Sequence, residues 1–330
     1  MTKDIDILGI GNAIMDIIAP VQDGFLSEHN MDKGSMILID EPRALMLNEA
    51  LNKTSDVQEI AGGSAANTMV GIAELGVKAG YISKVGKDGV GERLAQGYKD
   101  AGVIFNSKPS KSKTASARCM IAVTDDGERT MNTFLGANVE FSEADINTAD
   151  ILRAKTIYLE GYLFDSDAQK AAFIKAAETA KASGGQVALT LSDSFCVGRH
   201  RDAFKALAEN QTDILFANED ELLALYETDK LDTALDALAG KNTVVCVTRG
   251  EKGSVIQTSE RRHFVPAAPI EKLVDTTGAG DQYAAGVLAG RAMGLDWPDA
   301  GYLGSLAAAE VIQHYGARPE TPIHEMAIRD

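Results

Sequence analysis

Near the carboxyl-terminal end of the chain, a glycine-rich stretch ends in an acidic residue: DTTGAGDQYAAG, residues 275–286. An Ala-rich segment with helical periodicity follows, so three small residues stand at a predicted helix start: Gly278, Ala279 and Gly280. The first N–H groups of a helix have no partner within the helix and lie at the positive end of its dipole. We therefore expect an anion-binding hole here. Asp281 either complements the dipole as an ordinary first-turn acid or takes part in chemistry at that hole.

A second pair of glycines opens an earlier helical segment, GGSAANTMVGIAELG, at residues 62–76. Gly62 and Gly63 would let a ligand approach the backbone closely, and Ser64 can cap the helix. Asn67 lies one turn later, on the face that Gly63 shares. The segment predicts a substrate cradle; the alternative is a glycine turn with an Asn bonded to its own backbone.

Two further patterns follow predicted strands. In ILFANEDE, Asn218 and Glu221 are three residues apart on one helical face, a spacing that also fits a capping box. In VTRGEKGS, the residues Thr248, Gly250 and Gly253 form a turn that fits a ligand-binding loop and a β-hairpin almost equally well. On the residues alone, a capping box is the favoured interpretation of Asn218 and Glu221, whereas the turn at residues 248–253 stays open.

Better-known motifs do not match. GIGNAIMD has Ile14 in place of the third glycine of a dinucleotide fingerprint, and Asp16 comes too early to bind the ribose of NAD. GYISKVGKD has the wrong glycine spacing for a P-loop and Asp88 where Ser or Thr would hold magnesium. The five histidines show no zinc-binding spacing. An NAD-dependent oxidoreductase and a zinc enzyme are therefore disfavoured.

The elements that would position these motifs alternate along the chain. Short runs rich in Val, Ile and Leu are separated by Ala-rich helical segments, a pattern typical of βα units around a mostly parallel sheet. Strands are predicted at 5–10, 79–85, 156–160, 186–191, 213–216 and 243–247. Helices are predicted at 64–75, 89–101, 167–183, 201–209, 219–226, 279–293 and 298–314.

Two segments break this alternation. Residues 14–40 and 112–135 are predicted to form short alternating strands, the second with a turn at Asp126-Gly127. We expect the two to pair into a small sheet that serves as a lid. With no repeat and no Pro-rich linker, the chain is predicted to be one domain, residues 1–330, with a lid.

Composition limits the partners and the compartment. The net charge is −16, which argues against a nucleic-acid or anionic-membrane surface. The three cysteines, far apart, form no disulfide framework or CxxC motif, so a reducing compartment is expected. No apolar run is long enough to span a membrane, and Asp16 interrupts the amino-terminal one. These observations predict a cytoplasmic protein.

The stretches GGSAAN and DTTGAGD resemble the two signatures of the ribokinase-like (PfkB) carbohydrate kinase family, and they are widely separated and in the order that the family has. The resemblance spans nearly the whole chain and implies an α/β fold: a three-layer αβα sandwich with a small β-sheet lid. Within the family, ILGIGNAIMDI, AGGSAANT, TLSDSF and DGERTMNTFLGAN are most similar to the adenosine kinase subfamily. The implied activity is ATP-dependent phosphorylation of the 5′-hydroxyl of adenosine. A sugar kinase, an inosine or guanosine kinase and a non-catalytic nucleoside sensor are the alternatives.

The resemblance also implies roles for residues. Asp281 would be the catalytic base, and the amides of the anion hole would stabilise the transferring phosphoryl group, with the helix dipole keeping Asp281 ionised. The acceptor would be held by Asn12, Asp16, Gly62, Gly63 and Asn67. ATP and its phosphates would be held by Asn218, Glu221, Thr248, Gly250, Gly253, Thr277 and Arg129. Glu221 would bind Mg²⁺ through water. For Arg129, an exposed hairpin arginine is the alternative.

Other implications concern the base wall, cations and assembly. The apolar wall around the nucleoside base would come from Met36 and from Tyr162, Leu163 or Phe164. A potassium ion is a further candidate cofactor, held by Asp275, Thr277 and the turn around Gly316. The small-molecule acceptor is the only partner expected besides a second copy of the chain, as monomer or homodimer.

Overall fold

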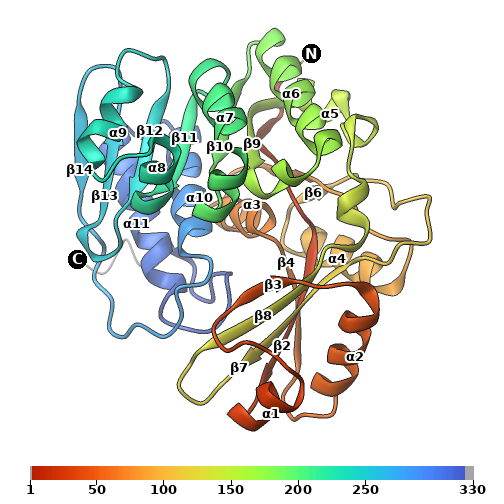
Figure 1. Ribbon diagram of the computed structural model, residues 1–330. Coiled ribbons are helices and arrows are strands. Elements are labelled where there is room, and N and C mark those ends of the chain that lie inside the picture. The colour runs from red at the N-terminus through yellow and green to blue at the C-terminus, as the bar shows by residue number, and fades with distance from the viewer. Residues whose placement is uncertain (1, 324–330) are drawn as a thin grey trace.

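The structure is a computed structural model that describes residues 2–323. Its main sheet has nine strands in the order β14-β13-β12-β11-β10-β9-β1-β5-β6 and crosses the upper part of Figure 1. All neighbouring strands run parallel except β13, which is antiparallel to both β12 and β14. The strands are β1 (Ile5–Ile10), β5 (Ala79–Ile82), β6 (Ile104–Phe105), β9 (Ala154–Glu160), β10 (Gln186–Thr190), β11 (Ile214–Asn218), β12 (Val244–Thr248), β13 (Ser254–Gln257) and β14 (Arg262–Val265).

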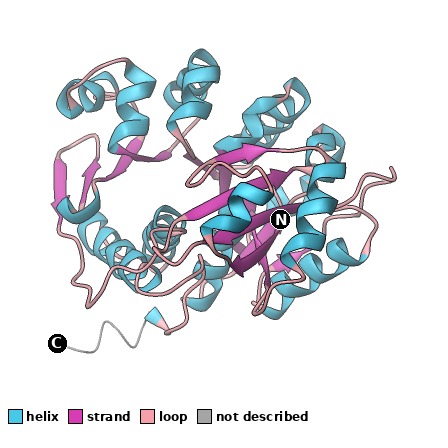
Figure 2. Ribbon diagram, turned by 60° about the horizontal axis from the view of Figure 1, so that its bottom comes forward, coloured by secondary structure: helices cyan, strands magenta, loops and turns pink. Residues whose placement is uncertain are grey.

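Helices cover both faces of this sheet, as Figure 2 shows. One face carries α3 (Ser64–Glu74), α4 (Gly89–Asp100), α10 (Ala279–Ala292) and α11 (Trp297–Val311). The other carries α5 (Thr148–Arg153), α6 (Asp167–Ala182), α7 (Ser194–Asn210), α8 (Glu219–Tyr226) and α9 (Leu231–Ala237). Short 3₁₀ turns span Gly136–Glu140, Glu143–Asp145, Gly161–Asp165 and Gly250–Lys252. The predicted three-layer αβα sandwich is confirmed.

The burial of the central strands explains their apolar runs. Along β12, Val245 and Val247 pack into the hydrophobic cluster on one face, whereas Cys246 packs into the cluster on the other. Because both faces of a parallel sheet are covered by helices, such strands have no polar alternation. This is why the central strands were predictable from short runs of Val, Ile and Leu.

A second sheet of five strands stands below the main one in Figure 1, in the order β3-β8-β7-β2-β4. Its strands are β2 (Ile14–Pro20), β3 (Met36–Leu38), β4 (Gln58–Gly62), β7 (Ala117–Val123) and β8 (Arg129–Phe134). Strands from both predicted segments pair here: β2 with β7, and β3 with β8, each in parallel. The turn between β7 and β8 contains Gly127 at φ 83°.

Several elements were not predicted. The segment 14–40 is not all strand, because the six-residue helix α1 (Asp23–Glu28) lies within it, and α2 (Glu41–Leu51) follows. Strand β4, with its mixed sequence QEIAG, the antiparallel strand β13 and the edge strand β14 were missed. Helix α7 begins at Ser194 instead of 201, because the Asp193 side chain caps it, and non-helical angles at His200 interrupt its periodicity.

Glycines let α10 pack closely against its neighbours. A Cβ atom on Gly286 would lie 2.6 Å from the Cα of Gly304 in α11. A Cβ atom on Gly71 of α3 would lie 2.9 Å from the Cβ of Ala285. Both distances are too short for real atoms, so these helices approach as closely as they do only with glycine at the contacts. The amino ends of α3 and α10 are thereby brought together.

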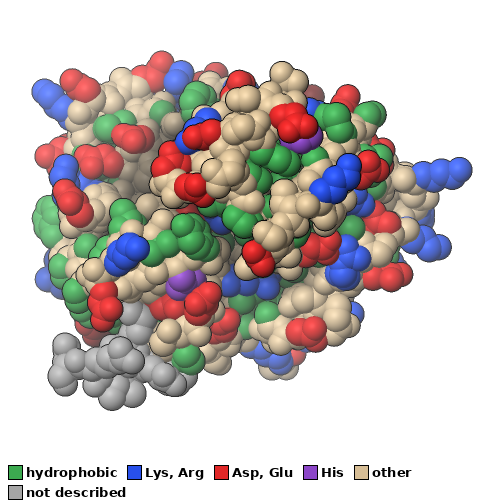
Figure 3. Space-filling view, turned by 90° about the horizontal axis from the view of Figure 1, so that it is seen from below, with side chains coloured by type: hydrophobic (Ala, Val, Ile, Leu, Met, Phe, Trp, Pro, Cys, Tyr) green, Lys and Arg blue, Asp and Glu red, His purple; other side chains and the backbone are tan. Residues whose placement is uncertain are grey.

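Within the described residues, no helix is long and apolar enough to cross a membrane. The surface seen from below the second sheet carries acidic and basic side chains interspersed with one another (Figure 3). No broad basic patch stands out on this face, in keeping with the acidic composition.

Candidate active site

The carboxylate of Asp281, in the first turn of α10, faces the first turn of α3. The hydroxyl of Ser64 donates to its Oδ1 at 2.6 Å, and Nδ2 of Asn67 donates to its Oδ2 at 3.1 Å. Ser64 therefore does not cap its helix as expected: the N-cap position belongs to Gly63, which has no side chain to accept a bond. The alternative of an Asn67 side chain bonded to its own backbone is also wrong.

Burial raises the pKa of Asp281 to about 6, and the hydrogen bonds from Ser64 and Asn67 oppose the rise only in part. Desolvation of the charged form therefore dominates its pKa, a cause that the expectation from the helix dipole did not include. At pH 7 the carboxylate is still mostly ionised. It is a stronger base than an ordinary Asp, which suits proton transfer near neutral pH.

The start of α10 has the geometry of an anion site, with one change from the prediction. Gly278 takes the left-handed conformation, φ 80°, directly before the helix. The N–H of Ala279 donates to the carbonyl of Thr276 at 3.2 Å, so it is not free as expected. Within residues 2–323, the N–H groups of Gly278, Gly280 and Asp281 have no such partner. These three amides remain available to an anion.

A cavity of about 280 Å³ lies in front of Asp281 and joins three of the seven predicted phosphate-binding residues, Asn218, Glu221 and Thr248. Its wall includes Ser64, Ser192, Asn218, Glu221, Thr248 and Gly280. The strands that contribute to it, β10, β11 and β12, are adjacent and parallel, and they end at this cavity. The carboxyl ends of parallel strands are the usual place for a ligand in an α/β sheet.

Asn218 and Glu221 form a capping box at the start of α8. Asn218 Oδ1 accepts from the Glu221 N–H at 2.8 Å, while Glu221 Oε2 accepts from the Asn218 N–H at 3.0 Å. Asn218 Nδ2 also donates to Glu221 Oε1 at 2.8 Å. Burial raises the pKa of Glu221 to about 7. The pair thus caps the helix and also lies on the cavity wall.

A larger, mostly apolar cavity of about 560 Å³ adjoins the first one. The two share Thr248, Thr276, Ala279, Gly280 and Tyr283. The turn between β12 and β13 forms one side of it, with Gly250 at φ 58° and Gly253 at φ 76°. That turn joins two antiparallel strands, so it is the β-hairpin turn that was one of the two alternatives. It also lines a cavity.

On the other side of Asp281, a glutamate that was not predicted organises two loops. Glu160 ends β9 and is 1% exposed. Its Oε1 accepts from the Asn12 N–H at 3.2 Å, and its Oε2 accepts from the Ala65 N–H at 2.7 Å. Burial raises its pKa to about 7. Glu160 thus fixes Asn12 beside the glycine pair, where Gly63 has φ 105°.

Asp16 lies on β2 of the second sheet, next to Gly62 on β4. Burial raises its pKa to about 7; the positive charges of Arg129 and Arg318 oppose this, and the charge of Asp281 adds to it. The contact with Gly62 places Asp16 beside the start of α3, whose Ser64 donates to Asp281. The structure therefore brings all the predicted acceptor-side residues to one region.

The face of the second sheet that carries Asp16 is otherwise largely apolar. Pairing across the strands sets Asp16 opposite Cys119, Cys119 opposite Thr133, and Thr133 opposite Leu38. Directly paired residues point to the same face. Leu38 and, two residues earlier, Met36 are 55% and 48% exposed, so this face ends in uncovered apolar side chains.

The other residues predicted to form the wall around the base differ in their burial. Leu163 and Phe164 are buried in the core, where Phe164 stacks on Phe204 with ring centroids 4.1 Å apart, so neither lines a cavity. Tyr162 is only partly buried, and its hydroxyl donates to the Ser192 carbonyl at 3.3 Å. Of the predicted wall residues, Met36 and Tyr162 remain accessible.

Arg129 is not the exposed hairpin arginine of the alternative reading. It is 9% exposed and bridges the second sheet to the loop before α10. Its Nη1 donates to Thr277 Oγ1 at 2.8 Å and lies 3.1 Å from Asp275 Oδ2. Its Nε and Nη2 atoms are buried without a partner in the described part of the chain, so the guanidinium has donors to spare.

Of the proposed potassium ligands, the Asp275 carboxylate is occupied by protein groups. Asp275 Oδ1 accepts from both the N–H and the hydroxyl of Thr277, and Asp275 Oδ2 accepts from the Gly316 N–H at 3.3 Å and pairs with Arg129. A carboxylate has about four acceptor positions. All of them are filled, so the Asp275 carboxylate has no position left for a potassium ion.

Magnesium fits only in the indirect way that was expected. Among the described residues, no group of three or more His, Cys, Asp or Glu side chains could hold a metal ion. Mg²⁺ commonly keeps several waters and takes one or two carboxylates together with substrate phosphates. Glu221, on the cavity wall, fits that use through water.

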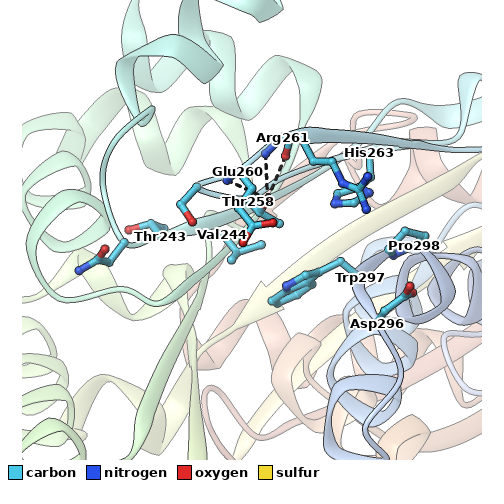
Figure 4. Close-up of a pocket in the computed structure, with 11 residues that line it drawn as sticks. Thr243, Val244, Thr258, Glu260, Arg261, His263, Asp296, Trp297 and Pro298 are labelled. Atoms are coloured by element: carbon cyan, nitrogen blue, oxygen red, sulfur yellow. Dashed lines mark hydrogen bonds between the residues drawn. The ribbon is translucent and has the colours of Figure 1, made fainter.

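A separate cavity of about 300 Å³ lies at the opposite end of β12 (Figure 4). Val244, Thr258 and Trp297 are among its walls. Val244 begins β12 and Trp297 begins α11, so this cavity is at the amino ends of the parallel strands, away from Asp281. It takes no part in the site.

A mostly parallel sheet with a helix amino terminus, a buried carboxylate and a cavity at the strand ends defines an α/β enzyme that binds an anionic substrate. Comparison with known proteins makes this specific. The pattern of the pfkB family carbohydrate kinase matches residues 34–324. The chain belongs to the pfkB family of carbohydrate kinases.

Among solved structures, adenosine kinase from Sinorhizobium meliloti is 45% identical over 98% of both chains, with a TM-score of 0.89. A probable sugar kinase from Rhizobium etli is 43% identical over 99% of this chain and 98% of its own, with a TM-score of 0.90. Adenosine kinase from Saccharomyces cerevisiae is 28% identical over 93% of this chain and 94% of its own. The protein is therefore a phosphotransferase with an alcohol group of a small molecule as acceptor, and the kinase family implies ATP as donor.

Proposed function

We propose that the protein transfers the γ-phosphoryl group of ATP to the 5′-hydroxyl of adenosine, giving AMP and ADP. The observation that carries the proposal is the position of Asp281, a carboxylate with a raised pKa beside the free amides of a helix start. The names of the relatives from S. meliloti and S. cerevisiae support adenosine as the acceptor.

In this proposal the two sides of the site have separate tasks. Asp281 accepts the proton of the acceptor hydroxyl, and the free amides at the start of α10 hold the charge on the transferring phosphoryl group. The apolar cavity beside Gly253 takes the base of ATP. Glu221 would hold Mg²⁺ through water, and the ion would neutralise the charge of the phosphates. Asn218 fixes the Glu221 carboxylate by donating to its Oε1. Arg129, which has unused donors, reaches the phosphates when the second sheet closes as a lid.

The second sheet favours a nucleoside over a free sugar. Asp16 can accept from the two ribose hydroxyls, beside Asn12, Gly62 and Gly63 and opposite Asn67. The same sheet face continues through Thr133 to the exposed Leu38 and Met36. An apolar surface next to a diol-binding carboxylate suits a flat base, whereas a sugar alone would leave it uncovered.

A sugar kinase is the second candidate, supported by the name of the relative from R. etli. Inosine or guanosine would fit the same apolar surface. A non-catalytic nucleoside sensor is least favoured, because a binding module has no need for Asp281 beside an anion site.

A coupled ADP-release assay across adenosine, inosine, guanosine, ribose and fructose tests the proposal. We expect kcat/KM for adenosine to exceed every other value by at least about tenfold, about 1.4 kcal/mol of transition-state binding. Preference for ribose or fructose would replace the proposal with the sugar kinase. No turnover with any acceptor would favour the sensor.

A further inference from the structure

Ser192, which follows β10, has a backbone conformation that its side chain disfavours. Its φ is 71°, in the left-handed region. Glycine adopts this region without steric cost, whereas a residue with a Cβ atom is strained there. The conformation is held on both sides. Leu191 N–H donates to the Phe216 carbonyl at 3.1 Å, and Asp193 caps α7 by accepting from the Cys196 N–H at 2.6 Å.

The hydroxyl of Ser192 does not explain this strain within the protein. Its Oγ is buried, and it has no hydrogen-bond partner among residues 2–323. The Ser192 carbonyl, in contrast, accepts from the Tyr162 hydroxyl at 3.3 Å. The backbone is therefore anchored while the hydroxyl is left with an unused donor. Strained conformations of this kind persist where they place a group for function.

Ser192 lies at the middle of the site. Ser192 lines the same cavity as Asp281, Glu221 and Gly280. Strand β10 lies between β9, which ends in Glu160 on the acceptor side, and β11, which ends in Asn218 on the phosphate side. A group at the end of β10 is thus placed where a phosphoryl group passes from donor to acceptor.

We propose that Ser192 is a catalytic residue whose hydroxyl donates a hydrogen bond to a non-bridging oxygen of the phosphoryl group in transit. The P–O bond to the β-phosphate oxygen of ATP breaks, and ADP keeps that electron pair. A new P–O bond forms to the acceptor oxygen, whose proton goes to Asp281. Ser192 keeps its own proton throughout. The inference rests on the proposed site for phosphoryl transfer and adds a donor to it.

The test uses Ser192→Gly and Ser192→Ala in the full chain, with the acceptor that the wild-type protein prefers. Glycine removes the hydroxyl and relieves the strain at once. We expect both variants to lose at least about tenfold in kcat, with KM for ATP and for the acceptor changed less than about twofold. The melting temperature of Ser192→Gly should equal or exceed that of the wild type.

Glu227→Gly is the matched control. Glu227 also has a left-handed conformation, φ 50°, but it lies at the end of α8 and outside the cavity. The control should keep wild-type kcat. Unchanged kcat in both Ser192 variants, or a rise in KM for ATP alone, would overturn the proposal. A loss of activity that follows a fall in melting temperature would also overturn it, because the role would then be structural.

The acceptor panel separates this inference from the proposed function. If the wild-type protein prefers a sugar to adenosine, the proposed acceptor is wrong, and the Ser192 variants are compared with that sugar. If the wild-type protein transfers phosphate and the variants match it, only the role of Ser192 fails.

Discussion

The carboxylate of Asp281 and the hydroxyl of Ser64 lie 2.6 Å apart, although 217 positions separate them in the sequence. The bond joins the first turns of α10 and α3. Because Asn67 holds the second oxygen of the same carboxylate, the base is fixed from one side and can face the cavity with its remaining lone pairs. Its position depends on close packing between two helices from opposite ends of the chain.

Asp281→Asn should lower kcat by about 10² to 10⁴ with ATP affinity nearly unchanged, because the amide cannot accept the acceptor proton. Steady-state kinetics and ATP titration measure the two effects. Asp299→Asn is the control: Asp299 is an exposed acid in the first turn of α11, so it complements a helix dipole without lining the site. Near-normal turnover of Asp281→Asn would show that its only role is that of an ordinary first-turn acid.

The pH dependence of kcat/KM should have an acidic limb near pH 6, where Asp281 gains its proton and stops acting as a base. The rate therefore rises from pH 5 to pH 7. Ser64→Ala should move this limb to higher pH, because the Ser64 hydroxyl stabilises the charged form and lowers the pKa. A limb that moves to lower pH in Ser64→Ala would contradict this assignment.

The ligand-free protein should become less stable as the pH rises from about 4 to 7. Burial raises the pKa of Asp16, Glu160 and Glu221 to about 7. The folded state then binds more protons than the unfolded chain over this range, so its stability is greatest at the acidic end and is lost as these groups ionise. Urea unfolding at several pH values measures this change in the free energy of unfolding.

Trp297 fluorescence can follow that unfolding, because this Trp lies far from the site, with the Arg291 guanidinium 4.3 Å from its ring. Glu160→Gln should make the pH dependence shallower by removing one of these titrations. Glu178→Gln, at an exposed position on α6, should leave it unchanged. An equal slope in Glu160→Gln and the wild type would refute the linkage.

Asp16→Ala should raise KM for the acceptor by about tenfold or more while KM for ATP stays constant, since a buried hydrogen-bonding partner of the acceptor is lost. Initial rates with each substrate varied in turn separate the two constants. Asp32→Ala, in the loop between α1 and β3, should match the wild type. If KM for the acceptor is unaffected in Asp16→Ala, Asp16 does not bind the acceptor.

Replacing KCl by choline chloride at constant ionic strength should change kcat by less than about twofold, because Arg129 already supplies the positive charge at Asp275. Strong activation by potassium in the wild-type protein would show that this arrangement opens in solution. Arg129→Ala removes the guanidinium, so any potassium effect should appear only in that variant.

The two glycine-rich motifs were readable from the sequence because their chemistry is local. Gly278 and Asp281 are neighbours at one helix start, and the anion site needs little more than that start. The central strands were equally readable, since burial on both faces leaves continuous apolar runs. Strand β4 was not, because its sequence is mixed and it pairs with β2, from a separate segment of the chain.

Residues that act through distant contacts were the ones missed or misjudged. Glu160 ends an apolar strand, and nothing nearby indicates that it accepts from residues 12 and 65. Arg129 in its hairpin sequence suggests exposure, and only the packing of the second sheet against the loop before α10 buries it. The pKa of Asp281 depends in the same way on tertiary burial, which no local pattern shows.

The contact between α3 and α10 also determines when the site can form during synthesis of the chain. During synthesis, Ser64 and Asn67 emerge from the ribosome long before Asp281 and the amides around Gly280. A nascent chain thus displays its half of the acceptor cradle with neither the base nor the anion site in place. The complete site therefore forms only when α10 joins α3.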